Sequence, residues 1–151
     1  PARKFSSEKT PAKIPGQDNF NHLRAVSNSQ KTYKLVCVDD SPTILREINR
    51  FLDQENLSVK AISDSTKALL EIIRFKPDII LLDVGMPGID GYKLCQLIRN
   101  HQSFKDIPIV MVTGNKGLID RAKARVAGAS DYLTKPFTQS DLSKMVFRYL
   151  T

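Results

Sequence analysis

The sequence has few of the residues that build disulfide frameworks or zinc sites. Among 151 residues there are two cysteines and two histidines, and the cysteines form no Cys-x-x-Cys pattern. Cys37 and Cys95 each lie inside an apolar run, which indicates buried, reduced thiols. His22 and His101 have no Cys or His neighbours at ligand spacing. Neither a disulfide nor a zinc site is therefore expected.

Long apolar runs are missing as well. The longest strictly apolar stretches, 79–82 and 109–112, are far shorter than the roughly 20 residues that a membrane-spanning helix needs. The N-terminus also lacks the apolar segment of a signal peptide. We therefore expect a cytoplasmic protein that does not bind a membrane.

The net charge of +7 is unevenly distributed along the chain. Residues 1–31 hold six basic and two acidic residues and three prolines, without sustained periodicity. Such a segment buries too little apolar surface to offset the entropy lost on ordering. We predict a disordered basic linker over 1–31 and one domain over 32–151. The linker has no dense Lys/Arg block, and we expect no direct binding of nucleic acid by the domain.

From residue 34 onward, strand patterns alternate with helix patterns. Short apolar runs predict strands at 35–38, 58–62, 79–82, 107–112 and 132–133, and helical spacing follows each of them. Ser41-Pro42 and the Thr138/Asp141 pair are typical of helix starts, and Gly128 is typical of a helix end. A strand–helix unit repeated five times predicts an α/β fold, with a parallel sheet that helices cover on both faces.

Polar side chains stand where four of these strands end. Asp39 and Asp40 follow the first strand, Asp83 the third, Thr113 the fourth and Lys135 the fifth. Ligands of such sheets bind beyond the carboxyl ends of the strands, so we expect these side chains to share one site. Clustered carboxylates repel one another, and Mg²⁺ relieves that repulsion. A hydroxyl and an ammonium can neutralise the oxygens of a phosphoryl group.

The motifs around these residues resemble the receiver domain of two-component response regulators, over 33–150. The matching segments are Val38-Asp39-Asp40-Ser41, the loop 82–91, Val112-Thr113-Gly114, 127–129 and 132–137. The resemblance implies a flavodoxin-like, doubly wound sheet of five parallel strands in the order 2-1-3-4-5, with five helices. It also implies a cis bond between Lys135 and Pro136.

By this resemblance, Asp83 accepts a phosphoryl group from a histidine kinase or a histidine phosphotransfer protein. Asp40 and Asp83 bind Mg²⁺ directly with the backbone carbonyl of Gly85, and Asp39 assists. Thr113 and Lys135 contact the phosphoryl group.

The resemblance also implies a conformational switch that involves Thr113 and Tyr132. The surface expected to change is made by the fourth helix, the fifth strand and the fifth helix. We expect phosphorylation to favour a homodimer through this mixed-charge face. If the chain is part of a longer one, an output domain is expected to precede residues 1–31.

Two positions depart from common forms of the family, since Gly85 offers no side chain over the site and Asn115 is an amide. The glycines at 85, 88 and 91 do not match GxGxxG, and we interpret them as a flexible turn. The main alternative is a receiver-like interaction module that works without phosphorylation. A haloacid-dehalogenase-type phosphatase fits less well, because the acidic pair Asp39-Asp40 is adjacent rather than DxD.

Overall fold

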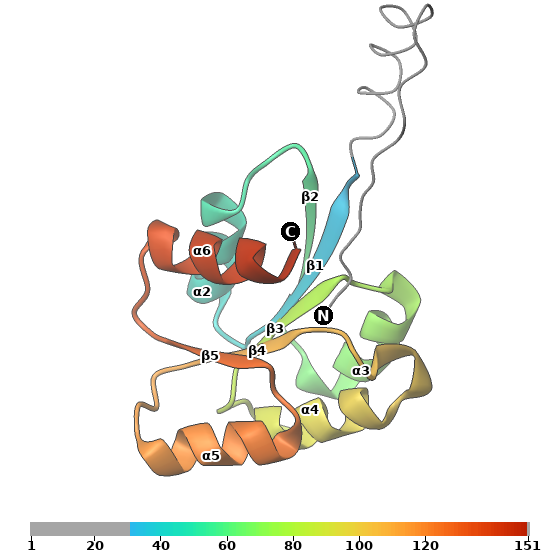
Figure 1. Ribbon diagram of the computed structural model, residues 1–151, viewed down its shortest axis with the longest axis vertical. Coiled ribbons are helices and arrows are strands. Elements are labelled where there is room, and N and C mark those ends of the chain that lie inside the picture. The colour runs from blue at the N-terminus through green and yellow to red at the C-terminus, as the bar shows by residue number, and fades with distance from the viewer. Residues whose placement is uncertain (1–30, 151) are drawn as a thin grey trace, which may run out of the picture.

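One parallel sheet forms the centre of the computed structural model, which describes residues 31–150 (Figure 1). Its strand order is β2-β1-β3-β4-β5. The strands are β1 (Tyr33–Val38), β2 (Leu57–Ile62), β3 (Ile79–Leu82), β4 (Ile109–Thr113) and β5 (Asp131–Thr134). The helices are α2 (Pro42–Phe51), α3 (Ser65–Phe75), α4 (Gly91–Asn100), α5 (Leu118–Ala127), α6 (Gln139–Leu150) and the 3₁₀ helix η2 (Gln102–Phe104). The predicted class, strand order and five α-helices are confirmed; the predicted linker lies outside the described residues, apart from Lys31.

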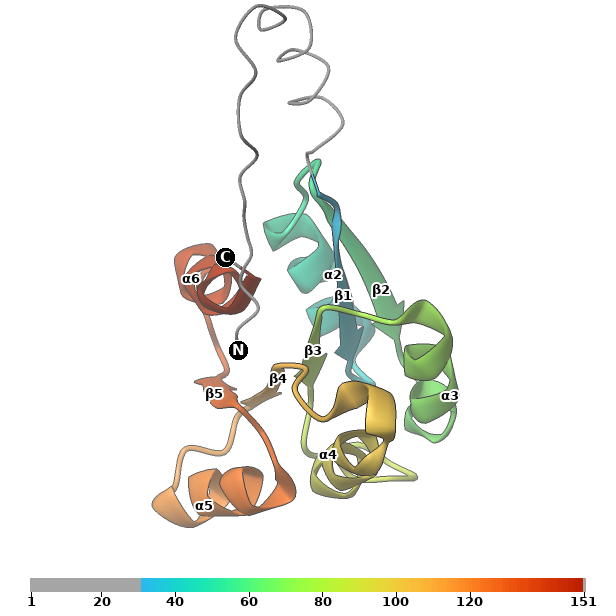
Figure 2. The same ribbon diagram turned by 45° about the vertical axis from the view of Figure 1, so that its right-hand side comes forward.

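Helices cover both faces of the sheet. Figures 1 and 2 show α2 and α6 on one side, and α3, α4 and α5 on the other. Successive residues of β1 point to opposite faces, so that Leu35 belongs to the core under α2 and α6 and Val36 to the core under α3 and α4. In β3, Ile79 and Ile80 divide in the same way. The uninterrupted apolar runs of the sequence therefore reflect strands that are buried on both sides.

The helix starts follow the predicted capping chemistry. Ser41 caps α2 by accepting a hydrogen bond from the amide of Ile44, and Pro42 occupies the first helical turn. Before α6, the amide of Thr138 donates to the Asp141 carboxylate, and the amide of Asp141 donates to the Thr138 hydroxyl. These reciprocal bonds satisfy two amides that have no partner inside the helix.

The starts of two predicted strands were wrong by two residues, and η2 was missed. β4 begins at Ile109, not Ile107, because Pro108 has no amide hydrogen to donate to the neighbouring strand. β1 begins at Tyr33, not Leu35, because its pairing with β2 extends to Tyr33 and Lys34, outside the apolar run. η2 is a single short turn, and three residues are too few to produce a periodic pattern. No helix within 31–150 has the length and apolarity needed to span a membrane.

Candidate functional site

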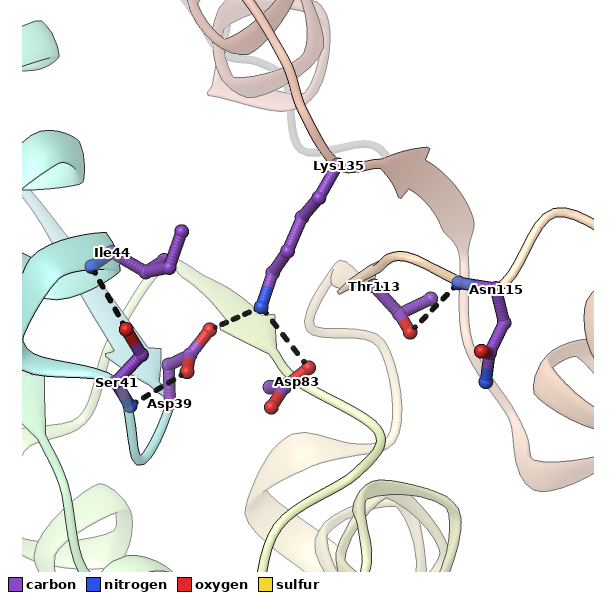
Figure 3. Close-up of polar contacts among 7 residues, drawn as sticks. All are labelled: Asp39, Ser41, Ile44, Asp83, Thr113, Asn115 and Lys135. Carbon is purple, nitrogen blue, oxygen red and sulfur yellow. Dashed lines mark hydrogen bonds and ion pairs between the residues drawn. The ribbon is translucent and has the colours of Figure 1, made fainter.

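The polar residues predicted at the strand ends meet at one edge of the sheet (Figure 3). Asp39 and Asp40 follow β1, Asp83 follows β3, Thr113 is the last residue of β4, and Lys135 follows β5. Parallel strands bring their carboxyl ends to the same edge, which explains how residues 96 positions apart can form an ion pair there. The Lys135–Pro136 bond is cis.

The Lys135 side chain lies between two carboxylates. Its Nζ is 2.8 Å from Asp39 Oδ2 and 3.3 Å from Asp83 Oδ1. Figure 3 shows the ammonium group between the two acids. Lys135 therefore pairs with acids at the ends of both β1 and β3, and Asp83 is not its only partner.

Three carboxylates form a compact cluster in this site. Oxygen atoms of Asp39, Asp40 and Asp83 lie within 4.8 Å of one another. Asp39 and Asp83 are only 3% and 7% exposed, whereas Asp40 is exposed. Both oxygens of Asp39 already have partners, because Oδ1 accepts from the amide of Ser41 at 2.9 Å and Oδ2 contacts Lys135. An all-oxygen donor set with a solvent-facing member fits Mg²⁺, which prefers oxygen ligands and keeps several waters.

The backbone after Asp83 is held against the start of α4. The amide of Gly91 donates to the carbonyl oxygen of Val84 at 2.8 Å. A Cβ atom at Gly91 would overlap the backbone oxygen of Asp83, so that only glycine fits there. Gly91 is thus the first residue of a helix in close contact with the strand end, and its interpretation as part of a flexible turn was wrong. Gly85 is exposed, and a Cβ there would meet no atom within 4 Å.

Burial and charge shift the pKa values of the two central groups. Burial raises the pKa of the Asp83 carboxyl, and the neighbouring Asp39 charge raises it further, while Lys135 opposes both effects. Burial by itself would lower the pKa of Lys135, but its hydrogen bonds and attraction to Asp39 and Asp83 outweigh this, so that its pKa is raised. Lys135 therefore stays positively charged, whereas the ionised form of Asp83 lowers the free energy of unfolding.

This loss of stability predicts a stabilising substitution. A carboxyl whose pKa is raised by folding destabilises the native state above that pKa. The penalty disappears as the pH falls through the raised value to the ordinary value of 3.8. Without divalent cations, Asp83→Asn should raise the melting temperature by a few degrees at neutral pH and by much less near about pH 4.

Calorimetry in EDTA, with the exposed Asp53→Asn as the control, measures this difference. An equal or lower melting temperature of Asp83→Asn at neutral pH would contradict it.

Thr113 and Tyr132 are joined through the backbone of Asn115. Both side chains are buried. Thr113 Oγ1 accepts a hydrogen bond from the Asn115 amide at 3.3 Å, and the Tyr132 hydroxyl donates to the Asn115 carbonyl at 2.7 Å. The Arg121 guanidinium lies 4.8 Å from the centre of the Tyr132 ring. Burial, followed by the influence of Tyr92, raises the pKa of Tyr132 to about 12, so its hydroxyl remains a donor at neutral pH.

Sequence reasoning did not find this connecting role of Asn115. It marked the residue only as a departure from common forms, because a contact through backbone atoms leaves no signal in residue type.

Comparison with known proteins decides the family. A family model described as the response regulator receiver domain matches residues 35–147. The chain belongs to this family of receiver domains. Protein PilG of Pseudomonas aeruginosa is 40% identical over 109 residues, which are 72% of this chain and 81% of PilG. The family consists of signalling phosphoacceptor domains, which separates the chain from the phosphatases considered above.

Solved receiver structures share the architecture. The chemotaxis response regulator CheY4 of Vibrio cholerae superposes with a TM-score of 0.75 at 28% identity, over 79% of this chain and 99% of that one. The receiver domain of the sensor histidine kinase PA1611 of P. aeruginosa gives 0.72 at 29% identity, over 79% and 98%. That structure has a magnesium ion coordinated in its active-site cleft. The acidic pocket of this receiver domain, made by Asp39, Asp40 and Asp83, is consistent with such a site.

Proposed function

We propose that this receiver domain accepts a phosphoryl group on Asp83 from a phosphohistidine of a histidine kinase or phosphotransfer protein. One observation carries the proposal: the buried Asp83 carboxylate has an ammonium group at 3.3 Å and forms a cluster with two further carboxylates whose oxygens lie within 4.8 Å. In the transfer, an Asp83 oxygen attacks the phosphorus atom, the phosphorus–nitrogen bond breaks, and the imidazole nitrogen keeps the electron pair and takes a proton.

The surrounding residues would bind the cation and the transferred phosphoryl group. Asp40, Asp83 and the backbone carbonyl of Gly85 would hold Mg²⁺, which supplies positive charge to the phosphoryl oxygens. Asp39 would assist in holding the cation, and it holds Lys135 in place through the 2.8 Å contact. The Lys135 ammonium is already 3.3 Å from the Asp83 oxygen, so it needs only a small movement to contact the transferred phosphoryl group.

Thr113 supplies a hydroxyl to the same phosphoryl group. This requires its side chain to exchange the contact with the Asn115 amide for one with a phosphoryl oxygen.

Incubation of the chain with a small phosphodonor and Mg²⁺, read by intact mass, tests this function. We expect the mass of one phosphoryl group per chain, and none when EDTA removes the cation. A wild-type chain that stays unlabelled at saturating Mg²⁺ would favour the phosphorylation-independent interaction module.

We further propose that the surface of α5, β5 and α6 changes when Asp83 is phosphorylated. The outer side of α5 supports a role in contact, because Leu118, Ile119 and Val126 are 85%, 73% and 82% exposed. Ala124 and Ala127, on its inner side, pack into the core. Large apolar side chains that are mostly exposed on one side of a helix are typical of surfaces that bind other proteins.

The charges around this apolar stripe favour a partner of opposite sign. Along 116–127 the charged residues are Lys116, Asp120, Arg121, Lys123 and Arg125. A partner with acidic side chains around an apolar contact would complement them. Two copies that met through α5 alone would bring like charges together, so a homodimer must draw its ion pairs from β5 and α6, where Arg148 pairs with Asp131.

Tyr132→Phe should disconnect this surface from the site. The substitution removes the hydroxyl that donates to the Asn115 carbonyl and leaves the ring in the core. With beryllofluoride and Mg²⁺ as a phosphate mimic, NMR shifts in the wild type should extend from Thr113 through Tyr132 into α5. In Tyr132→Phe the mimic should still bind and shift Thr113, but most of the shifts in α5 should be lost.

The matched control is Tyr33→Phe, at the N-terminal end of β1 and away from the site. Full α5 shifts in Tyr132→Phe would show that the relay does not depend on this hydrogen bond.

A further inference from the structure

Ser65, the first residue of α3, makes two contacts that its helix does not require. Its side chain is buried, at 3% exposure. Its Oγ donates to the carbonyl oxygen of Pro87 at 2.7 Å and accepts from the amide of Ile89 at 3.1 Å. The cap of α3 is formed by a different residue, Asp64, which accepts from the Thr66 amide. The Ser65 hydroxyl therefore serves the loop that follows β3, 22 to 24 positions away.

This loop carries the centre of the proposed chemistry. It begins at Asp83 and contains Gly85, whose carbonyl we propose as a metal ligand. Hydrogen bonds hold the loop on both sides of that carbonyl. Before it, the Val84 oxygen accepts from the Gly91 amide; after it, the Ser65 hydroxyl binds the backbone of Pro87 and Ile89. The space beside Gly85 is open, since a Cβ atom there would meet no atom within 4 Å, and these hydrogen bonds hold the backbone on either side of its carbonyl.

The loop passes close over the start of α3. Gly88 lies between the two backbone groups that Ser65 binds and has a φ of +89°, which favours glycine. A Cβ atom at Gly88 would be 3.0 Å from Ser65 Oγ and from Thr66 Cγ2. The fit leaves room for a small side chain that is both donor and acceptor, which is what a serine hydroxyl provides.

We propose that Ser65 is a positioning residue for the metal and phosphorylation site. It acts through the loop 83–89, by keeping the Gly85 carbonyl and the Asp83 carboxylate in the geometry that binds Mg²⁺ and accepts the phosphoryl group. The inference rests on the proposed function. It adds to the site a residue from α3, an element that contributes none of the five polar side chains at the strand ends.

Ser65→Ala is the direct test. The substitution leaves a part-buried carbonyl and a part-buried amide without their partner, and the loop should relax to pair them elsewhere. We expect Mg²⁺ affinity to fall about tenfold, the low end for losing an outer hydrogen bond of a metal site. Phosphorylation by a small donor should be slower even at saturating Mg²⁺.

Three measurements separate positioning from simple stability. Titration calorimetry gives the Mg²⁺ affinity, and intact mass gives the phosphorylation rate. Hydrogen exchange of the Ile89 amide without Mg²⁺ reports on its hydrogen bond to Ser65. Ser58→Ala, at an exposed position of β2, is the matched control and should behave as wild type. Ser65→Thr and Ser65→Val, which are the same size and differ in the hydroxyl, provide the comparison if alanine prevents folding.

Faster Ile89 exchange in Ser65→Ala, together with weaker Mg²⁺ binding and better function of threonine than of valine, would support the proposal. Faster exchange with unchanged Mg²⁺ affinity and phosphorylation rate would overturn it, and so would equal Mg²⁺ affinity of the threonine and valine variants where both are folded. A wild-type chain without Mg²⁺ binding would overturn the proposed function and this inference with it, whereas the other outcomes concern Ser65 alone.

Discussion

Asp83→Asn should take up no phosphoryl group under conditions that label every wild-type chain once. The amide of asparagine is a poor nucleophile and cannot form the mixed anhydride that a carboxylate forms with phosphate. Neither neighbour is expected to substitute for it. Both oxygens of Asp39 are engaged by Ser41 and Lys135, and Asp40 is exposed rather than held against the lysine. The expected loss is complete, and intact mass after incubation with a small phosphodonor and Mg²⁺ measures it.

Asp53→Asn is the control, because this carboxylate is exposed and outside the site. It should be labelled like the wild type. Undiminished labelling of Asp83→Asn would assign the modification to another residue and remove Asp83 from its proposed role. The thermal measurement described above shows independently whether the variant is folded.

The sequence predicted the fold and the members of the acidic pocket because both depend on strand order. Apolar runs fix where the strands lie, and parallel pairing brings the strand ends to one edge of the sheet. Asp39, Asp83 and Thr113 could therefore be placed together without knowing the course of any loop. The same reasoning placed Lys135 beside them, but it did not show that the shorter contact of Lys135 is with Asp39 rather than with Asp83.

Contacts that depend on the course of a loop could not be predicted. Gly91 fits against the backbone of Asp83, and Ser65 binds backbone groups in 87–89, but neither contact follows from residue spacing or hydrophobic pattern. The link from Thr113 to Tyr132 runs through backbone atoms of Asn115, to which the residue type contributes little. Local patterns determine elements, whereas such tertiary hydrogen bonds are known only once the loops are placed.

Asp40→Ala should abolish detectable Mg²⁺ binding, whereas Asp39→Ala should weaken it. Asp40 is the exposed member of the pocket, so its carboxylate can bind a cation that retains several waters. The Asp39 oxygens are held by the Ser41 amide at 2.9 Å and by Lys135 at 2.8 Å, which leaves Asp39 to act through charge and through water.

The loss expected for Asp39→Ala is about tenfold, the size found when an outer partner of a metal site is removed. Part of that loss comes from Lys135. Without Asp39, the ammonium keeps Asp83 as its remaining carboxylate partner and competes with the cation for the same oxygen atoms. Adding Mg²⁺ should raise the melting temperature of the wild type and, less strongly, of Asp39→Ala, because a ligand that binds only the folded state stabilises it.

The same addition should leave the melting temperature of Asp40→Ala unchanged. Calorimetric titration gives the affinities, with Asp53→Ala as the control for removing an exposed carboxylate. An unchanged titration in Asp40→Ala would contradict the proposed ligand set. A larger loss in Asp39→Ala than in Asp40→Ala would show instead that the cation displaces Lys135 and binds the buried pair, Asp39 and Asp83, directly.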